Sequence, residues 1–238
     1  MAEPKLEIFV LSYNRAAFLR DSLLSLYNQT FQDFRITVLD DCSTDDTAEV
    51  VRELQKEYPL AFLPNEKNSG QIFNFMRIRD LAKAPWVMAF HDDDILHPKA
   101  LESMFALLEK HPACTQLSTN YVSFQSGEPV AYTNDVRLDE YWHFRDQKHY
   151  ASFCFTDNTV AFCSSLYRLD ALKGIEFDRE CYGLMYDRVA MLEAVGKGEV
   201  CVLKAPLLHY RLHAGQVSQN RKTGPYLSNA LHLAAYYA

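Results

Sequence analysis

Short apolar runs alternate with amphipathic stretches in the first part of the chain. Runs with the length and composition of buried strands lie at Leu6–Leu11, Phe34–Leu39, Leu60–Leu63 and Trp86–Phe90. Between the first two runs, apolar residues recur with helical spacing at Phe18, Leu19, Leu23, Leu26 and Tyr27. We predict a helix there, a second opened by a capping box at Ser43–Asp46 and running through Leu54, and a third over Gln71–Ala82.

Alternating strands and helices at this spacing predict an α/β fold with a mainly parallel sheet. Ligands bind such sheets outside the carboxyl ends of the strands. Polar clusters follow three of the predicted strands, at Ser12–Arg15, Asp40–Asp46 and His91–Asp94. Their convergence predicts a binding site at this edge of the sheet.

The second half of the chain has a less regular pattern. We predict a strand over Thr115–Phe124, a helix over Tyr186–Val195 that ends at the glycines Gly196 and Gly198, a strand over Val200–Leu203, and an extended segment over Pro206–His213. An aromatic-rich stretch, Tyr141–Phe155, fits either a wall for a sugar acceptor or core packing. We predict a single domain over residues 1–238, with residues 219–238 forming a C-terminal helix that continues in a longer native protein.

Composition narrows the class of protein. The chain has 238 residues, of which 48% are apolar, and this suits a sizeable core. A formal net charge of −7 argues against a nucleic-acid partner, because such binding depends on Lys and Arg. The six cysteines are scattered without a CxxC pair, so we predict neither a zinc ribbon nor a disulfide framework. With no signal peptide or apolar run long enough for a membrane span, we expect a cytoplasmic protein, with peripheral attachment to the inner face of the membrane compatible with this pattern.

The three carboxylates of Asp92, Asp93 and Asp94 carry the strongest chemical signal. Adjacent carboxylates after a buried strand repel one another unless a positive charge is close, and a hard divalent cation with phosphate oxygens would satisfy them. A solvated acidic turn or a helix cap is the alternative for this segment taken alone. The neighbouring histidines His91 and His97 fit either metal ligation or ordinary loop positions.

A second acidic cluster begins at Asp40. An Asp at a strand end can accept hydrogen bonds from a base or a ribose, and Asp41 is the candidate. Helix capping by Ser43, with a helix-dipole contribution from Asp45 and Asp46, is the plain interpretation of the residues that follow. Both interpretations can hold together, because they concern different residues.

Taken in order, these segments resemble the signatures of family 2 glycosyltransferases. The resemblance rests on Val10–Arg15, Leu39–Asp45, Asn68–Gly70, Phe90–Asp94, and the pair Tyr210–His213 and Gly215–Ser218. It extends over about residues 6–218. Because the motifs follow one another in the family's order, the match is far more specific than any one of them.

The resemblance implies a GT-A fold, an inverting transfer and a divalent metal ion, Mn²⁺ or Mg²⁺. It implies that Asp41 contacts a uracil or thymine ring and that Asp92, Asp93 and Asp94 hold ribose and metal. With Asp92 and Asp94 as the outer members, the implied metal ligands are Asp92, Asp94 and His213, and Asp93 is the rival ligand. The further donor-binding residues implied are Ser12, Tyr13, Asn14, Arg15, Asn68, Gly70 and Arg211.

Asp187 matches the acidic residue that serves the family as catalytic base at a helix start. Here it follows Tyr186 rather than Glu or Gly, so an N-capping role is the alternative. A second departure is Phe73-Asn74-Phe75, which stands where the family often has Ala-Arg-Asn. Arg77 or Arg79 could take over the donor contact of that missing arginine.

The sequence therefore predicts an inverting glycosyltransferase that moves a sugar from a UDP- or dTDP-linked donor to an acceptor hydroxyl. The resemblance implies a saccharide or lipid-linked saccharide acceptor in cell-envelope polysaccharide or glycan synthesis. We expect residues 1–97 to bind the donor and residues 98–218 the acceptor. The alternatives are a sugar nucleotidyltransferase and a nucleotide-sugar-binding module without turnover. The first would hold a triphosphate with a Gly-rich loop, and Ser12–Ala16 contains no glycine.

Overall fold

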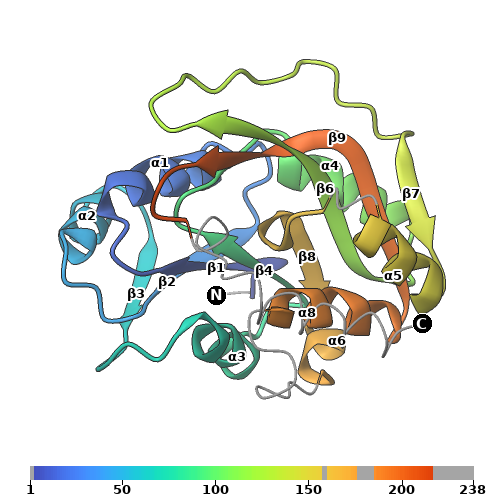
Figure 1. Cartoon of the computed structure of the whole chain (residues 1–238), viewed down its shortest axis with the longest axis horizontal. Helices are drawn as coiled ribbons and strands as arrows, with labels where there is room; N and C mark the ends of the chain where they lie inside the picture. Colours follow the sequence, from blue (N-terminus) through green and yellow to red (C-terminus); the bar gives the residue numbers. More distant parts are fainter. Residues whose placement is uncertain (1–2, 157–159, 176–184, 217–238) are drawn as a thin grey trace.

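The computed structural model describes residues 3–156, 160–175 and 185–216. In these ranges one sheet has the strand order β3-β2-β1-β4-β8-β6-β9-β5, and β7 also pairs with β9 (Figure 1). The mainly parallel α/β fold expected from the sequence is confirmed. The sheet continues from β3 to β7, so it spans both of the predicted halves.

The four predicted strands of the first half form the parallel part of the sheet. They are β1 (Leu6–Ser12), β2 (Phe34–Asp40), β3 (Leu60–Pro64) and β4 (Trp86–His91). β1 lies between β2 and β4, and it is buried along its whole length because helices cover both faces of the sheet. The ends of β1, β2 and β4 therefore meet at one edge, where Leu11 pairs with both Leu39 and His91.

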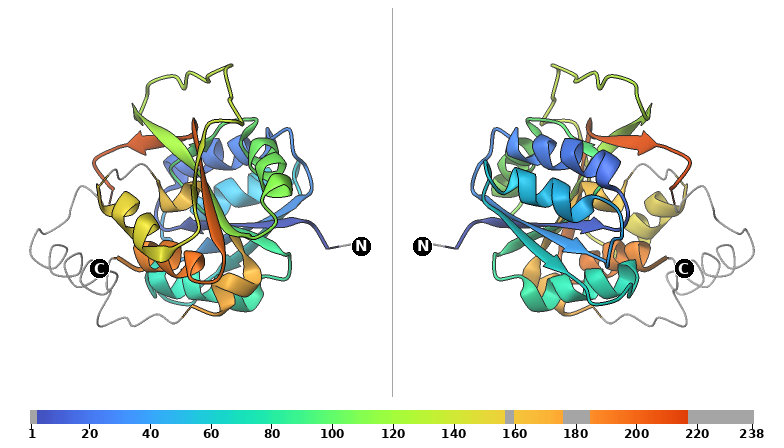
Figure 2. Two further views of the ribbon diagram at one scale, coloured as in Figure 1. Left: turned by 90° about the vertical axis from the view of Figure 1, so that its right-hand side faces the viewer. Right: turned by 90° about the vertical axis from the view of Figure 1, so that its left-hand side faces the viewer.

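Helices cover the sheet on its two faces (Figures 1 and 2). On one side lie α1 (Ala16–Tyr27), α2 (Thr47–Leu54) and α4 (Ala100–Lys110), whose apolar side chains pack on Leu6, Ile8 and Val10 of β1. On the other side lie α3 (Gln71–Leu81), α5 (Gln147–Thr156), α6 (Leu169–Lys173) and α8 (Tyr186–Val195), which share a core with Phe9 and Leu11. The period-2 alternation of β1 thus divides its side chains between two cores.

The rest of the sheet adds β5 (Ile95–Leu96), β6 (Cys114–Gln125), β7 (Tyr141–Phe144), β8 (Ser165–Arg168) and β9 (Glu199–Leu212); a 3₁₀ turn, η1, covers Phe162–Ser164. β8 runs antiparallel to both β4 and β6, whereas β6 and β9 are parallel. The strand predicted over Val200–Leu203 and the extended segment that follows it are one long strand, β9. The C-terminal part of β9 pairs with β5, which directly follows the acidic motif in the sequence.

Two local predictions need correction or completion. The helix after Asp46 exists, but the capping box at Ser43–Asp46 is wrong. The Ser43 hydroxyl donates to Asp40 and accepts the Asn14 amide N–H at 2.8 Å, while Asp45 accepts the Thr47 amide N–H at 3.1 Å. Ser43 therefore joins the loops after β1 and β2.

The aromatic stretch over Tyr141–Phe155 mostly packs in the core, where Tyr150 and Phe153 are buried and Trp142 and Phe144 are partly buried.

The predicted C-terminal helix over 219–238 lies outside the described residues, as do Val217 and Ser218. In the part of the chain that the structure describes, no helix is long and apolar enough to cross a membrane.

Candidate active site at the carboxyl edge of the sheet

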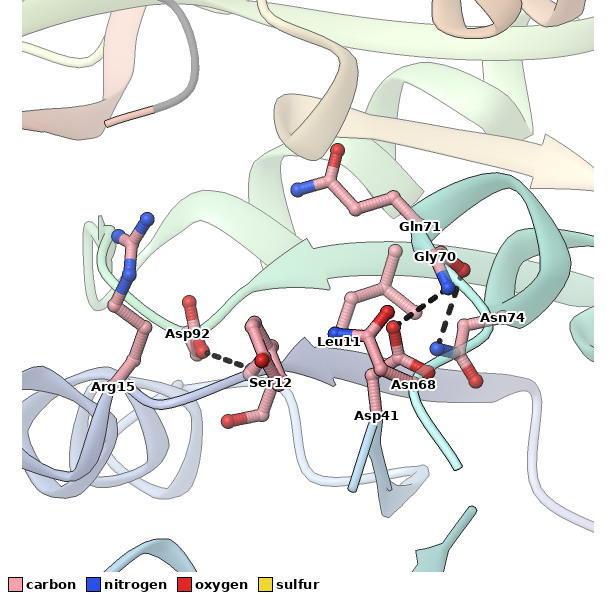
Figure 3. A pocket seen from close by; sticks show the side chains of 10 residues that line it. Leu11, Ser12, Arg15, Asp41, Asn68, Gly70, Gln71, Asn74 and Asp92 are labelled. Atoms are coloured by element: carbon pink, nitrogen blue, oxygen red, sulfur yellow. Dashed lines mark hydrogen bonds between the residues drawn. The ribbon is translucent and has the colours of Figure 1, made fainter. Parts of the chain in front are cut away.

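A pocket opens where the loops after β1, β2 and β4 meet the start of α3 (Figure 3). Most of its lining residues have polar side chains; the lining consists of Leu11, Ser12, Tyr13, Arg15, Asp41, Asn68, Gly70, Gln71, Asn74 and Asp92. Seven of the residues that the sequence analysis gave to donor binding lie in this lining: Ser12, Tyr13, Arg15, Asp41, Asn68, Gly70 and Asp92. Tyr13 is 45% exposed, so its ring is available for stacking.

Asp41 is buried at the floor of this pocket and organises the turn opposite β2. Its Oδ1 accepts hydrogen bonds from the Asn65 side chain and the Ser69 amide, each at 2.8 Å. Its Oδ2 accepts the Gly70 amide N–H at 2.8 Å. Gly70 has a φ of +86°, a backbone conformation that residues other than glycine rarely adopt, so this turn depends on glycine. Asp41 therefore has a structural role that the sequence pattern did not reveal.

Asn14 joins the loops after β1 and β2. Its φ of +52° lies in the left-handed region, which Asn enters more readily than most residues. The Thr44 amide N–H donates to Asn14 Oδ1 at 2.8 Å, and the Asn14 amide donates to Ser43. Asn14 does not line the pocket, so its described contacts shape the loop that carries Tyr13 and Arg15.

The three carboxylates of the acidic motif have different surroundings. Asp92 accepts the Tyr13 amide N–H at 3.2 Å and faces the pocket. Asp93 lies 2.7 Å from Arg15 Nη1 and 3.0 Å from His213 Nε2. Asp94 is fully buried, and its two oxygens accept from the Arg211 amide and the Cys163 thiol, each at 3.0 Å.

The acidic motif lacks positive charge for its degree of burial. Burial, followed by the charge of Asp93, raises the pKa of Asp92 to about 7. The same two causes, in the same order, raise the pKa of Asp94 well above its usual range. Arg15 provides a cation at Asp93, but the Asp92 carboxylate remains costly to ionise. A further cation at the exposed side of the motif would lower that cost.

His213 and Arg15 compete for the same carboxylate. His213 Nε2 lies 2.8 Å from Arg15 Nη1 as well as 3.0 Å from Asp93 Oδ2. One ring nitrogen can accept from the guanidinium or donate to the carboxylate, but it cannot do both. A divalent cation between Asp93 and His213 would remove this conflict, since both atoms are good ligands for it. The residues present therefore fit a metal, with Asp93 rather than Asp94 next to His213.

Arg211 is enclosed behind the acidic motif. Its guanidinium lies between the rings of Phe18 and Phe124, at 5.1 and 4.8 Å from their centroids. Its Nε donates to the Asp93 carbonyl at 2.8 Å, and its side chain is only 6% exposed. The contacts of Arg211 in the described residues thus hold β9 against the acidic loop.

Asp187 lies in the first turn of α8 and is partly exposed. Its Oδ1 accepts the amide N–H of Arg188 at 2.8 Å. The preceding Tyr186 packs on Phe162 and on Phe75 of α3, with ring centroids 5.8 and 5.6 Å apart. Burial lowers the pKa of His91, and the negative charges of Asp93 and Asp187 offset part of this effect. The start of α8 is therefore next to the end of β4.

The other residues singled out in the sequence have ordinary partners. His97 is buried and contacts the Thr133 carbonyl at 2.9 Å. Arg77 donates to Asn65 at 2.5 Å, and Arg79 donates to the Ile175 carbonyl at 2.5 Å. Gln71 and Asn74, which the sequence analysis did not assign to the site, line the pocket; their position at the start of the helix after Asn68–Gly70 was the available signal.

The fold and this polar edge define an α/β protein whose ligand site lies at the carboxyl ends of its parallel strands. The chain belongs to glycosyl transferase family 2, since the model of that family matches residues 7–175. The order of its motifs predicted this family.

Individual relatives are more distant. An uncharacterized glycosyltransferase of Methanocaldococcus jannaschii is 26% identical over 184 residues, which cover 76% of this chain and 61% of the relative. A GalNAc(5)-diNAcBac-PP-undecaprenol beta-1,3-glucosyltransferase of Campylobacter jejuni is 37% identical over 103 residues, covering 42% of this chain and 33% of the relative. In these alignments the chain thus spans only part of the length of its relatives.

A solved structure shows the same fold at low sequence identity. The crystal structure of residues 1–349 of S. aureus TarS in complex with UDP-GlcNAc has a TM-score of 0.74 and 21% identity to this chain. The match covers 98% of this chain and 66% of TarS 1–349. At this identity the similarity establishes the fold.

Proposed function

We propose that this glycosyltransferase transfers a sugar from a UDP- or dTDP-linked donor to an acceptor hydroxyl, with inversion and with the help of Mn²⁺ or Mg²⁺. The observation that carries the proposal is the meeting of Asp93, His213 and Arg15 beside the pocket that contains Asp41 and Asp92. This arrangement offers one region for a diphosphate and an adjoining region for a nucleoside. A saccharide or lipid-linked saccharide is the proposed acceptor, supported by the name of the Campylobacter relative.

The diphosphate belongs at the acidic motif. We assign metal ligation to Asp93 and His213, with Asp92 next to them, in place of the set Asp92, Asp94 and His213. Both oxygens of Asp94 already accept hydrogen bonds in a fully buried position, and this supports the change. A divalent ion there supplies Lewis-acid stabilisation of the leaving diphosphate. The Arg15 guanidinium lies within the same group and can pair with phosphate oxygens.

The base and ribose belong in the pocket. Tyr13 offers a partly exposed ring for stacking, and Asp41 offers a carboxylate beside the amides of Asn68 and Asn74. A uracil or thymine ring presents an imide N–H between two carbonyl oxygens, which suits one acceptor flanked by amide donors. Cytosine lacks that imide N–H, so the arrangement favours UDP and dTDP.

Asp187 is the proposed general base. Its carboxylate accepts the proton of the acceptor hydroxyl while the hydroxyl oxygen attacks the anomeric carbon. The bond from that carbon to the diphosphate oxygen breaks, and the diphosphate leaves on the opposite face of the sugar, so the configuration inverts. The position of α8 next to the end of β4 supports this role.

A panel of nucleotide sugars tests the proposal through the thermal stability of the protein. With Mn²⁺ present, UDP- and dTDP-sugars are expected to raise Tm with the logarithm of their concentration, because they bind only the folded state. GDP-sugars and nucleoside triphosphates serve as controls. Stabilisation by triphosphates instead would favour a nucleotidyltransferase, and donor binding with no release of UDP in the presence of acceptors would favour a binding module.

Exchange of Asp41 for asparagine is expected to lower the affinity for UDP by about 10- to 100-fold. A hydrogen bond to a charged group contributes about 1.5–3 kcal/mol, and each 1.4 kcal/mol is about tenfold in affinity. The measurement is calorimetric titration with UDP, CDP and GDP. Alanine is a poorer probe, because it would release all three donors, Asn65, Ser69 and Gly70, whereas asparagine keeps one oxygen that can accept from two of them.

The matched control for this experiment is Asp40→Asn. Asp40 is the last residue of β2, directly before Asp41, and is equally buried, but it bonds Ser43 rather than the turn that lines the pocket. Its substitution should leave the order of nucleotide affinities unchanged. An Asp41→Asn protein that folds and still prefers UDP to the same degree would remove Asp41 from base recognition.

A further inference from the structure

A second cluster of metal-ligating side chains lies far from the pocket, at the opposite end of β9. A ring nitrogen of His111, a ring nitrogen of His143 and the Cys201 thiol all lie within 4.8 Å of one another. The Cys114 sulfur is 3.3 Å from the Cys201 sulfur. We call these four residues the His–Cys cluster. Figure 1 shows β7, which carries His143, at the end of the sheet remote from β3.

The cluster joins three stretches of the chain, because His111 and Cys114 are only three residues apart. His111 directly follows α4, Cys114 begins β6, His143 is in the middle of β7, and Cys201 is near the start of β9. His143 pairs directly with Cys201 across the antiparallel β7–β9 ladder. The two cysteines are fully buried and the two histidines are half-buried, so the cluster has a protected thiol side and an imidazole side open to ions.

Neighbouring oxygen atoms hold both imidazoles in place. His143 Nε2 lies 2.8 Å from Glu199 Oε2, and His111 Nε2 lies 3.0 Å from the Tyr141 hydroxyl. Metal-bound histidines usually have this arrangement, in which one ring nitrogen bonds a carboxylate or other oxygen and the other ligates the metal. The two rings also contact each other edge-on, with centroids 4.6 Å apart.

The spacing is close to that of a tetrahedral site. With zinc bonds of about 2.3 Å to sulfur and about 2.0–2.1 Å to nitrogen, ligand atoms in such a site lie roughly 3.3–3.8 Å apart. Atoms of His111, His143 and Cys201 lie within 4.8 Å of one another, and the Cys114 sulfur adjoins this group through Cys201, whose sulfur is 3.3 Å away. Closing His111, His143 and Cys201 onto an ion therefore needs shifts on the order of 1 Å.

We propose that His111, His143, Cys201 and Cys114 form a structural zinc site that fixes β7 to the start of β9 and the end of α4. Two thiolates and two imidazoles form a ligand set that selects Zn²⁺ over the hard ions Mg²⁺ and Mn²⁺. The site would be independent of the carboxylate site at Asp93, because thiolates select softer metals than carboxylates do. Its occupancy would stabilise the part of the sheet that extends beyond β8.

Cobalt spectroscopy tests the site, because only thiolate ligands give Co²⁺ a charge-transfer band in the near ultraviolet. The chelator-treated protein, kept reduced, is titrated with Co²⁺ in excess Mg²⁺ so that the carboxylate site is occupied. One equivalent of Co²⁺ should bind with a tetrahedral spectrum, and Zn²⁺ should displace it and raise Tm. Zinc content of the protein as purified is measured by mass spectrometry.

Matched variants locate the site. A rival group, His91, Asp94 and Cys163, also offers one thiol within ligand distance, next to the acidic motif. Cys201→Ser and the half-buried His143→Gln should each weaken Co²⁺ binding by at least about 100-fold. Cys163→Ser and the exposed His149→Gln should leave the spectrum unchanged. Using His143→Gln as well covers the case in which the buried Cys201→Ser protein fails to fold.

Two results would overturn the proposal. One is the absence of a thiolate band in the wild-type protein at stoichiometric Co²⁺. The other is loss of the band in Cys163→Ser with retention in Cys201→Ser and His143→Gln. Neither result depends on nucleotide binding, so the zinc site can fail while the proposed transferase function holds.

Discussion

Replacing Asp187 with asparagine is expected to abolish sugar transfer while donor binding stays nearly intact. Removal of a general base typically lowers a rate by about 10²- to 10⁴-fold. Asparagine has the size of aspartate and can still accept the Arg188 amide N–H, so the start of α8 should survive. Asparagine cannot take a proton from the attacking hydroxyl. The measurements are the rate of UDP release with acceptor and the Kd for UDP.

An aspartate at the same position of another helix provides the control. Asp170 lies in the first turn of α6 and bonds the next amide N–H, that of Ala171, at 2.7 Å, just as Asp187 bonds Arg188. Asp170→Asn should therefore be nearly silent in transfer. If Asp187→Asn transfers sugar as fast as Asp170→Asn does, Asp187 is a cap, and the base must be sought at Asp178 or Glu180, which lie outside the described residues.

The regular part of the fold could be predicted because its strands and helices are visible in the local pattern of apolar and polar residues. The four parallel strands are short apolar runs, and the predicted start and end of α8 match the observed helix Tyr186–Val195. Parallel strands buried on both faces must be apolar throughout, so the pattern survives without knowledge of the partners. Each of the four strands extends one residue beyond the prediction at its C-terminal end.

The elements that the sequence did not predict depend on partners far along the chain. β5 has only two residues and exists because Ile95 and Leu96 pair with β9. β8 is a four-residue strand placed between β4 and β6. Runs this short carry no usable periodicity, because strands and turns of that length look alike. Ser43 was misassigned for a related reason, since its partner Asn14 is on another loop.

The sequence predicted which motifs form the site, but not which side chain of a motif contacts which partner. Three consecutive aspartates leave the register ambiguous in the sequence. Burial separates them, because Asp94 turns toward Cys163 whereas Asp93 reaches Arg15 and His213. The His–Cys cluster was beyond prediction for the same reason. Its members come from three distant stretches of the chain, at His111–Cys114, His143 and Cys201, and only the pairing of β9 with β6 and β7 brings these stretches together.

The assignment of the metal to Asp93 can be tested by comparing Asp93→Asn with Asp94→Asn. Wild-type protein is expected to bind UDP at least about tenfold more tightly in Mn²⁺ than in EDTA, since a divalent ion held by Asp93 and His213 would offset the charge of the diphosphate. Asp93→Asn should lose this difference. It should still fold, because an asparagine oxygen can accept from Arg15 as the carboxylate does at 2.7 Å. Equal affinity of the wild-type protein in EDTA and Mn²⁺ would eliminate the metal role altogether.

Asp94→Asn should show the opposite behaviour. Its new amide group would face the donors that now meet the Asp94 oxygens, the Arg211 amide and the Cys163 thiol. A buried donor left without an acceptor costs about 1–3 kcal/mol, so Tm should fall. The response of UDP binding to Mn²⁺ should remain, provided it is measured well below that lower Tm. Loss of the Mn²⁺ response in Asp94→Asn together with its retention in Asp93→Asn would restore Asp94 as the ligand. The decisive comparison is between Tm and the dependence of UDP affinity on Mn²⁺. Substitution of a purely structural carboxylate lowers Tm, whereas substitution of a metal ligand removes the Mn²⁺ dependence.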